Sequence, residues 1–186
     1  MMTGSDMSGD ARSILDFWFR EIGPDRWWTR SDATDEAIRK RFLALWEEWR
    51  SRSTESFLTT SLEALAAVVL FDQFPRNMFR GDERAFATDG LALAMAEAAV
   101  DRGFDQELTE DERVFLYMPF MHAEDLAKQD RCVALFEALG LPEQVRYARE
   151  HRAIIARHGR FPARNAALGR ETRPEEREAI EASKTW

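Results

Sequence analysis

Charged and amide side chains interrupt an otherwise apolar stretch at Asp72–Gly81, directly after the most hydrophobic run of the chain. Polar groups at the edge of a core must be paired or face a cavity. Two arrangements meet that requirement. In a structural corner, Asp72 pairs with an arginine and Asn77 caps a helix or turn. In an anion pocket, Arg76 and Arg80 hold the charge and Asn77 adds a neutral hydrogen bond.

A second polar group, His122, Glu124 and Asp125, follows Pro119, a residue that is expected to disturb a helix. A neutral imidazole beside carboxylates can act as a general base or bind a ligand or a metal. The spacing matches no recognised metal-binding motif, so we expect no metal site. The alternative is a helix N-terminus, where Glu124 and Asp125 favour the positive end of the dipole.

A third polar group lies near the C-terminal end of the chain and consists of His151, His158, Arg160, Arg164, Asn165 and Arg170. The two histidines are seven residues apart, hence on one helix face, and are expected to face solvent. The stretch Arg160–Asn165 also resembles Gln73–Asn77, because in each a Phe-Pro pair is followed closely by Arg and Asn. If these two Phe-Pro corners meet, their arginines would form one site.

Several classes of site have no support in the sequence. Glycine-rich nucleotide loops, a Gly-x-Ser-x-Gly elbow and Cys-x-x-Cys pairs are all missing from it, and no cofactor is expected. Cys132 is the single cysteine and sits among apolar residues, which is typical of a small buried hydrophobe. The formal net charge of −8 disfavours binding to nucleic acid or to an anionic membrane. Because the sequence has no secretory signal and no membrane-length apolar run, the cytoplasm is the expected location.

Helices must position these groups, because strand patterns are nearly absent from the sequence. Apolar periodicity and capping residues predict about eight helices joined by short loops, packed as antiparallel pairs in a bundle or a short α-solenoid. We expect a disordered tail at 1–9 and a single all-helical domain at 10–186. The expected helices cover 11–21, 34–50, 62–71, 91–102 with Asp89 as its cap, a segment after a capping box at Thr109, 123–139, a segment from Pro142 to about Gly159, and a charged segment after Thr172.

Seven short segments carry a family resemblance: Leu15–Phe19, Val69–Gly81, Arg84–Asp89, Arg113–Phe120, His151–Arg157, Gly159–Asn165 and Leu168–Arg170. Together they resemble the signature of the bacterial domain of unknown function 924 family, over about 14–180. The resemblance implies a fold similar to tetratricopeptide-like helical arrays and no established activity. The family commonly has Glu-His-Ser-Glu where Met121–Glu124 stands, and histidine in place of Ala163. No role that needs those family residues is expected here.

The fold expected is therefore all-α, a tetratricopeptide-like array of antiparallel helix hairpins. Grooves in such arrays usually hold a peptide or partner protein. The leading hypothesis is a binding module for a peptide, a protein or a small anionic ligand, with the Arg-Asn corners as a carboxylate clamp. The second is an enzyme acting on a small anionic substrate, with His122 or Glu124 as general base and Asp72 orienting an arginine. In the third, the polar corners are only structural.

Overall fold

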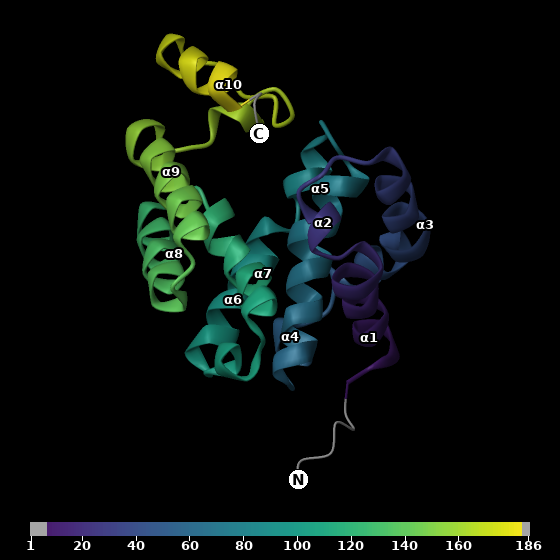
Figure 1. Ribbon diagram of the computed structural model, residues 1–186. Coiled ribbons are helices and arrows are strands. Elements are labelled where there is room, and N and C mark those ends of the chain that lie inside the picture. The colour runs from purple at the N-terminus through teal and green to yellow at the C-terminus, as the bar shows by residue number, and fades with distance from the viewer. Residues whose placement is uncertain (1–6, 184–186) are drawn as a thin grey trace. The chain divides into compact units, whose positions relative to one another are not determined.

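Helical periodicity and caps run through the sequence, and the computed structural model describes residues 7–183 as helices and short connections (Figure 1). This described range contains no β-strand, so the predicted all-α class is confirmed, and it contains no helix long and apolar enough to cross a membrane. Backbone contacts divide it into two compact units. Unit 1 comprises residues 7–80 and Arg84–Pro119, and unit 2 comprises Gly81–Glu83 and residues 120–183. The single domain and its tetratricopeptide-like arrangement stay predictions.

Unit 1 contains the helices of the first two thirds of the chain. The boundary between the units falls inside α7 (Glu110–His122), after Pro119. Short π-helical and 3-10 segments separate several of the helices. The elements are α1 (Gly9–Leu15), η1 (Asp16–Ile22), α2 (Pro24–Trp27), α3 (Asp32–Trp49), η2 (Thr54–Phe57), α4 (Ser61–Val68), η3 (Val69–Gln73), α5 (Phe74–Met78), η4 (Glu83–Phe86), α6 (Asp89–Asp101) and η5 (Phe104–Glu107).

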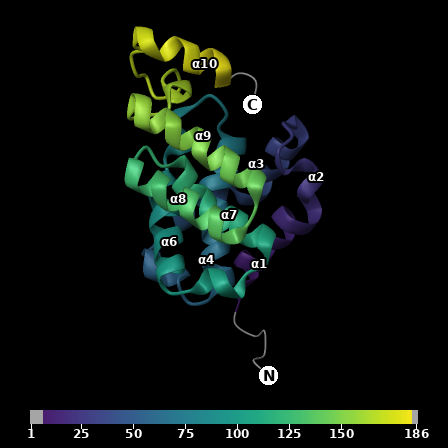
Figure 2. The same cartoon turned by 60° about the vertical axis from the view of Figure 1, so that its left-hand side comes forward.

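Helix α4 is the buried centre of unit 1. Its residues 64–68 have no exposed surface, as expected for a run that is apolar nearly all round. It lies between α1 and α6 in both ribbon views (Figure 1, Figure 2). From α6, the buried Ala92, Ala96 and Ala99 are small enough to let a neighbouring helix approach closely. The central helix therefore provides a rigid base for the polar segment that follows it.

The first turn of α4 also holds the beginning of the described chain. The N–H of Glu63 donates to Thr60 Oγ1 at 3.2 Å, which is half of a capping box. The Glu63 carboxylate does not return to Thr60 but accepts bonds from the N–H and the hydroxyl of Ser8. Ser8 is in turn the N-cap of α1. Part of the expected tail is thus ordered, while residues 1–6 lie outside the described residues.

Unit 2 is built on the antiparallel hairpin of α8 (Leu126–Leu139) and α9 (Pro142–His158), which lie side by side in both views (Figure 1, Figure 2). Gly140 ends α8 with φ at +77°, a left-handed conformation that a side chain would strain. Pro142 opens α9, as the sequence predicts. Cys132 is buried, as expected. The chain continues through η6 (Pro162–Arg164), η7 (Pro174–Glu176) and α10 (Arg177–Ser183).

Three local expectations are wrong. Pro119 does not end or break α7, which continues to His122, because the proline stands within one turn of the end of the helix and removes only its own donor. Asp89 does not cap α6 from outside: the N-cap is Thr88, and Asp89 is the first helical residue. The expected helices at 11–21 and 62–71 each change into a π-helical segment part-way along.

Candidate functional site

The predicted site residues of unit 1 lie where a proline interrupts a helix. Pro75 has no N–H, so the carbonyl four residues earlier, that of Phe71, loses its usual α-helical donor. Thr88 Oγ1 donates to this carbonyl at 2.7 Å and accepts a bond from Trp46 Nε1 at 3.1 Å. Both side chains are buried. Thr88, which is distant in sequence, therefore replaces the missing backbone donor at this corner, and Trp46 donates to the same hydroxyl.

Asp72 is a buried carboxylate of this corner, with 0% of its surface exposed. Arg76 Nη1 lies 3.4 Å from Asp72 Oδ1, and Gln73 Nε2 donates to Asp72 Oδ2 at 2.6 Å. The same guanidinium group donates two bonds to Asp89, of 2.9 and 3.0 Å. Arg76 is thus shared between two carboxylates, as a buried charge requires. This arrangement is the structural corner of the two alternatives read from the sequence.

Arg80 and Asn77 belong to the same corner. Arg80 donates from Nε and Nη2 to the two oxygens of Asp35, at 2.7 and 2.9 Å, and from Nη2 to Asn77 Oδ1 at 3.0 Å. Asn77 Nδ2 donates to the carbonyl of Gln73 at 3.0 Å. Both arginines that were expected to hold an anion are therefore bound by carboxylates of unit 1. An external anion would have to displace a bidentate carboxylate from each of them.

In unit 2, Arg160 and Asn165 converge on a carboxylate that was not among the predicted residues, that of Glu176. Arg160 donates to it from Nε and Nη2 at 2.7 and 2.9 Å, and Asn165 Nδ2 donates at 2.9 Å. The N–H of Arg173 adds a fourth bond, at 2.9 Å. These bonds, above all the one from Arg160, lower the pKa of Glu176 to about 2. The cluster holds the C-terminal segment in place with its charges fully paired.

Glu124 joins the connection between α7 and α8 to the segment after α9. Arg170 donates to its two oxygens at 2.7 and 3.1 Å, and the N–H of Phe161 donates to Oε1 at 2.7 Å. Burial opposes ionisation of Glu124, but these bonds outweigh it and hold its pKa below the usual range. A carboxylate with a lowered pKa and three donors is a poor general base. The geometry therefore gives Glu124 a structural task.

Side chains also cap the end of α7. Asp125 is the N-cap of α8 and accepts a bond from the N–H of Lys128 at 3.0 Å, so the helix N-terminus alternative is confirmed for Asp125. Arg164 Nη2 donates to the carbonyl of His122 at 2.8 Å. The buried Gln129 donates from Nε2 to three further carbonyls, those of Phe120, Met121 and Ala123. The last carbonyls of the helix, which lack helical partners, are thus satisfied within unit 2.

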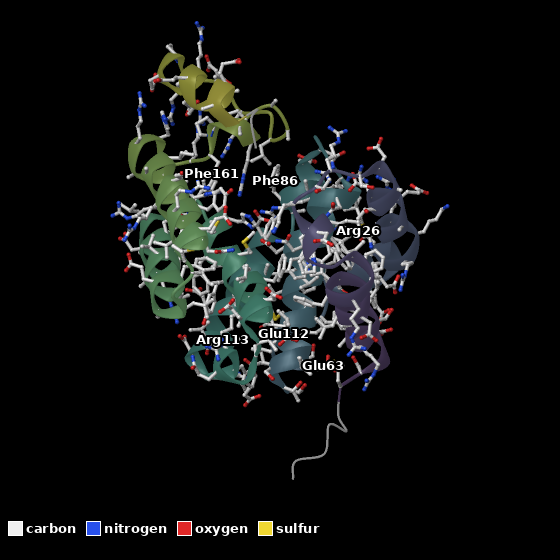
Figure 3. All side chains as sticks on the ribbon, in the orientation of Figure 1. Arg26, Glu63, Phe86, Glu112, Arg113 and Phe161 are labelled. Atoms are coloured by element: carbon white, nitrogen blue, oxygen red, sulfur yellow. The ribbon has the colours of Figure 1, made fainter. Side chains whose placement is uncertain are left out.

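Two nitrogen-bearing side chains contact the ring of Phe161, which Figure 3 labels near the C-terminal end of α9, and the charge of a third, His122, acts on one of them. We call His122, His151 and Arg164 the histidine–arginine cluster. The guanidinium carbon of Arg164 lies 4.7 Å from the centroid of the Phe161 ring, and the His151 ring lies edge-on at 5.6 Å. Burial lowers the pKa of His151 to about 4, and the charges of His122 and Arg164 act in the same direction. His151 is therefore neutral in an electropositive setting.

The expectation that His151 and His158 face solvent is wrong. Only 7% of His158 is exposed, and His151 is half-buried. Helical spacing places both histidines on the same face of α9 as the buried Ala148 and Ile155, so they pack into unit 2 rather than away from it. His151 is consequently a candidate for function, although its expected exposure to solvent had left it outside the predicted ligand-binding residues.

The comparison with known proteins agrees with the family resemblance. Residues 14–184 match the family model described as bacterial protein of unknown function, DUF924. The chain belongs to this family. A similar solved structure is that of a protein of unknown function from Agrobacterium tumefaciens, which is 45% identical to the DUF924 chain, with a TM-score of 0.86. The similarity covers 92% of this chain and 97% of that one. No curated protein matches the chain.

The predicted ligand-binding residues of this DUF924 chain fall into two sets, one in each unit. Because the two Phe-Pro corners belong to different units, their union in one site stays a prediction. Over residues 7–183, no three His, Cys, Asp or Glu side chains are grouped so that they could hold a metal ion. Unit 1 contains Asp72, Arg76, Asn77 and Arg80, and unit 2 contains His122, Glu124, Asp125, Arg160, Arg164 and Asn165.

A groove of about 650 Å³ runs along the α8–α9 hairpin, and none of the predicted residues lines it. Its walls include Pro142, Val145 and Ala153. The charged residues at its edge are paired with one another: Arg149 with Glu137 and Arg146 with Glu150, at 2.6 and 2.9 Å. None of the three residues of the histidine–arginine cluster lines this open groove, although Glu150 at its edge acts on His151.

Proposed function

We propose that this protein is a binding module for a small anionic ligand, which it takes at the histidine–arginine cluster of unit 2. The observation that supports it best is the environment of His151. The pKa of this half-buried imidazole is lowered by burial and, in the same direction, by its interactions with His122 and Arg164. A negative charge placed among these groups would reverse the unfavourable electrostatics.

The arginines at the other polar corners already hold carboxylates and are not proposed as the anion site. Arg76, Arg80, Arg160 and Arg170 each hold a carboxylate of their own unit through two bonds. A ligand that displaced one of those carboxylates would leave it unpaired, which costs several kcal/mol when the group is buried. The carboxylate clamp expected at the Arg-Asn corners is thus already closed by residues of the chain itself.

Binding fits the cluster better than proton transfer does. Glu124, one of the two residues proposed as general base, is fixed by Arg170 and has a lowered pKa. One ring nitrogen of His151 accepts no hydrogen bond from the described residues, but a pKa of about 4 makes His151 a weak base near neutral pH. The enzyme hypothesis with His122 or Glu124 as general base therefore ranks second.

Imidazole NMR tests this proposal directly, because the chain has only three histidines. The His122→Gln and His151→Gln variants assign the signals. Inorganic phosphate is then added near pH 6 at constant ionic strength. We expect a saturable shift of the His151 signal and no shift of His158, which is buried two turns further along α9. No saturable change at His151, or equal changes at all three histidines, would contradict the proposal.

A matched pair of arginine variants locates the bound charge. Arg164→Gln removes the cation of the cluster and should weaken phosphate binding about tenfold or more, since a hydrogen bond to a charged group contributes about 1.5–3 kcal/mol. Arg157→Gln removes an exposed arginine that lies on α9, with 63% of its side chain exposed, and should leave binding unchanged. Because Arg164 also caps α7, the unshifted His158 signal serves as the check that the variant is folded.

A further inference from the structure

The neutral form of His151 has one defined tautomer. Its Nδ1 lies 2.8 Å from the carbonyl oxygen of Tyr147, one turn earlier in α9. A carbonyl oxygen can only accept a hydrogen bond, so Nδ1 must carry the proton. A neutral imidazole has one N–H, and Nε2 therefore presents a lone pair. This nitrogen can accept a hydrogen bond but cannot donate one.

No residue within 7–183 makes a hydrogen bond to this lone pair. The bond from Nδ1 to Tyr147 is the one hydrogen bond that the His151 ring makes among the described side chains and backbone. The ring is held from another side by its edge contact with Phe161, at 5.6 Å and an interplanar angle of 70°. Arg164 contacts the same Phe161 ring through its guanidinium group. A half-buried acceptor and a cationic donor are thus oriented by one aromatic side chain.

The charges around His151 keep it neutral. The charged and titratable groups that face it are His122 from the end of α7, Arg164 from η6 and Glu150 from α9. Burial and the first two lower its pKa, while Glu150 and the Tyr147 carbonyl act in the opposite direction and do not restore it. Near pH 6 and above, Nε2 is therefore an acceptor in a positive environment.

We propose that the ligand of this cluster carries both a negative oxygen and a proton of its own, as a singly or doubly protonated phosphoryl group does, and that a fully ionised oxyanion such as sulfate is rejected. This inference rests on the proposed function. The negative oxygens face the positive groups, and the P–OH donates to Nε2 of His151. Sulfate has the same size and shape as phosphate but no proton near pH 6. It would set an oxygen lone pair against the lone pair of Nε2, which leaves a half-buried acceptor without a donor.

Isothermal titration near pH 6, with the full chain and with sodium phosphate or sodium sulfate as the probe, tests the inference. Phosphate should bind about tenfold or more tightly than sulfate, which corresponds to the loss of one hydrogen bond at a half-buried site. Methyl phosphate is the third probe. Tighter binding of methyl phosphate than of inorganic phosphate identifies a phosphate monoester as the ligand, the reverse identifies free phosphate, and both results support the proposal.

Two variants of His151 separate the acceptor from the fold. His151→Asn keeps a donor at the position of Nδ1 for the Tyr147 carbonyl and removes the acceptor at Nε2. It should bind phosphate and sulfate within about twofold of each other. His151→Gln places an amide at the position of Nε2, where the amide can rotate to accept or to donate. It should therefore gain sulfate binding relative to the unmodified protein.

The outcomes distinguish the two proposals. If neither anion binds, the anion-binding function and the present inference both fail. If sulfate and phosphate bind equally well to the unmodified protein, the anion site stands and the requirement for a proton on the ligand is refuted. A preference for phosphate that persists in His151→Asn would also refute it, because a group other than His151 would then accept the hydrogen bond from the ligand's proton.

Discussion

Thr88→Val keeps the shape of a buried side chain at the corner of unit 1 and removes only its hydroxyl. Two groups lose that partner: the carbonyl of Phe71, whose α-helical donor Pro75 cannot supply, and the indole N–H of Trp46. Thr88 is 1% exposed and Trp46 is 0% exposed, so water does not replace the lost bonds. An unsatisfied buried group costs about 1–3 kcal/mol, and the new methyl group offsets about 1 kcal/mol. We expect a net loss of about 3 kcal/mol.

Urea unfolding followed by circular dichroism measures this loss as a lower midpoint at constant slope. In thermal unfolding the same loss corresponds to a Tm about 6–12 °C lower, given about 2–4 °C per kcal/mol for a chain of this size. Thr29→Val is the matched control, because it makes the same chemical change on an exposed side chain. It should alter stability by less than about 0.5 kcal/mol.

A double-mutant cycle with Trp46→Phe shows whether the two bonds act as one relay. In the Trp46→Phe background there is no indole N–H to leave unpaired, so Thr88→Val should cost about 1 kcal/mol less than in the unmodified protein. Equal costs in the two backgrounds would show that Trp46 is not coupled to Thr88. A Thr88→Val protein within about 0.5 kcal/mol of the unmodified one would refute the account of this corner altogether.

Three further predictions concern unit 2. The pKa of His151 is lowered to about 4, so below about pH 6.5 the unfolded chain binds a proton at this histidine that the folded chain does not bind. Up to about 3 kcal/mol of stability should therefore be lost as the pH falls from about 6.5 to 4. His151→Gln should flatten that part of a stability–pH curve. Arg170→Met should lower the free energy of unfolding in urea by about 2 kcal/mol, because it removes the partner of Glu124. It should also weaken the loss of stability below about pH 4.5 that the lowered pKa of Glu124 produces. Arg149→Met, on the exposed surface, should cost less than about 0.5 kcal/mol. Burial raises the pKa of Cys132 to about 12, so a thiol reagent should modify the native protein at no more than about a hundredth of the rate seen in urea; comparable rates would contradict its burial.

Helices with explicit local determinants were predictable from the sequence. The box at Thr109 and Glu112 exchanges both of its bonds, with Thr109 N donating to Glu112 Oε2 at 2.8 Å and Glu112 N donating to Thr109 Oγ1 at 3.4 Å. Gly140 and Pro142 end and begin helices as expected. Each of these features depends on residues within about four positions of one another. That is the distance over which propensity and capping act.

The partners of the polar corners were not predictable in the same way. Arg80 is 45 positions from Asp35, and Arg170 is 46 from Glu124, so no local spacing announces either pair. A sequence shows that an arginine near a core needs a partner, but not whether that partner is a carboxylate of the chain or a ligand. The two alternatives for Asp72–Gly81 differ in that choice alone, and folding decides it.

The histidines show a different limit of sequence reasoning. The periodicity of α9 indicated that His151 and His158 share a face, and that part was correct. Whether that face was exposed to solvent or buried depended on Phe161 and the segment after it, which returns to the helix. The functional candidate His151 therefore emerged only once this returning segment was placed.

The bond between Ser8 and Glu63 has a consequence for where this fold begins. Sequence likeness to the family starts at residue 14, yet the buried carboxylate of Glu63 receives donors from residue 8. A chain trimmed to the region of family likeness would retain every recognisable motif and leave that carboxylate without the two donors it uses. The family likeness and the hydrogen bonds therefore place the start of the domain at different residues. For expression, truncation or fusion of this protein, the chemically complete edge is the one that includes Ser8.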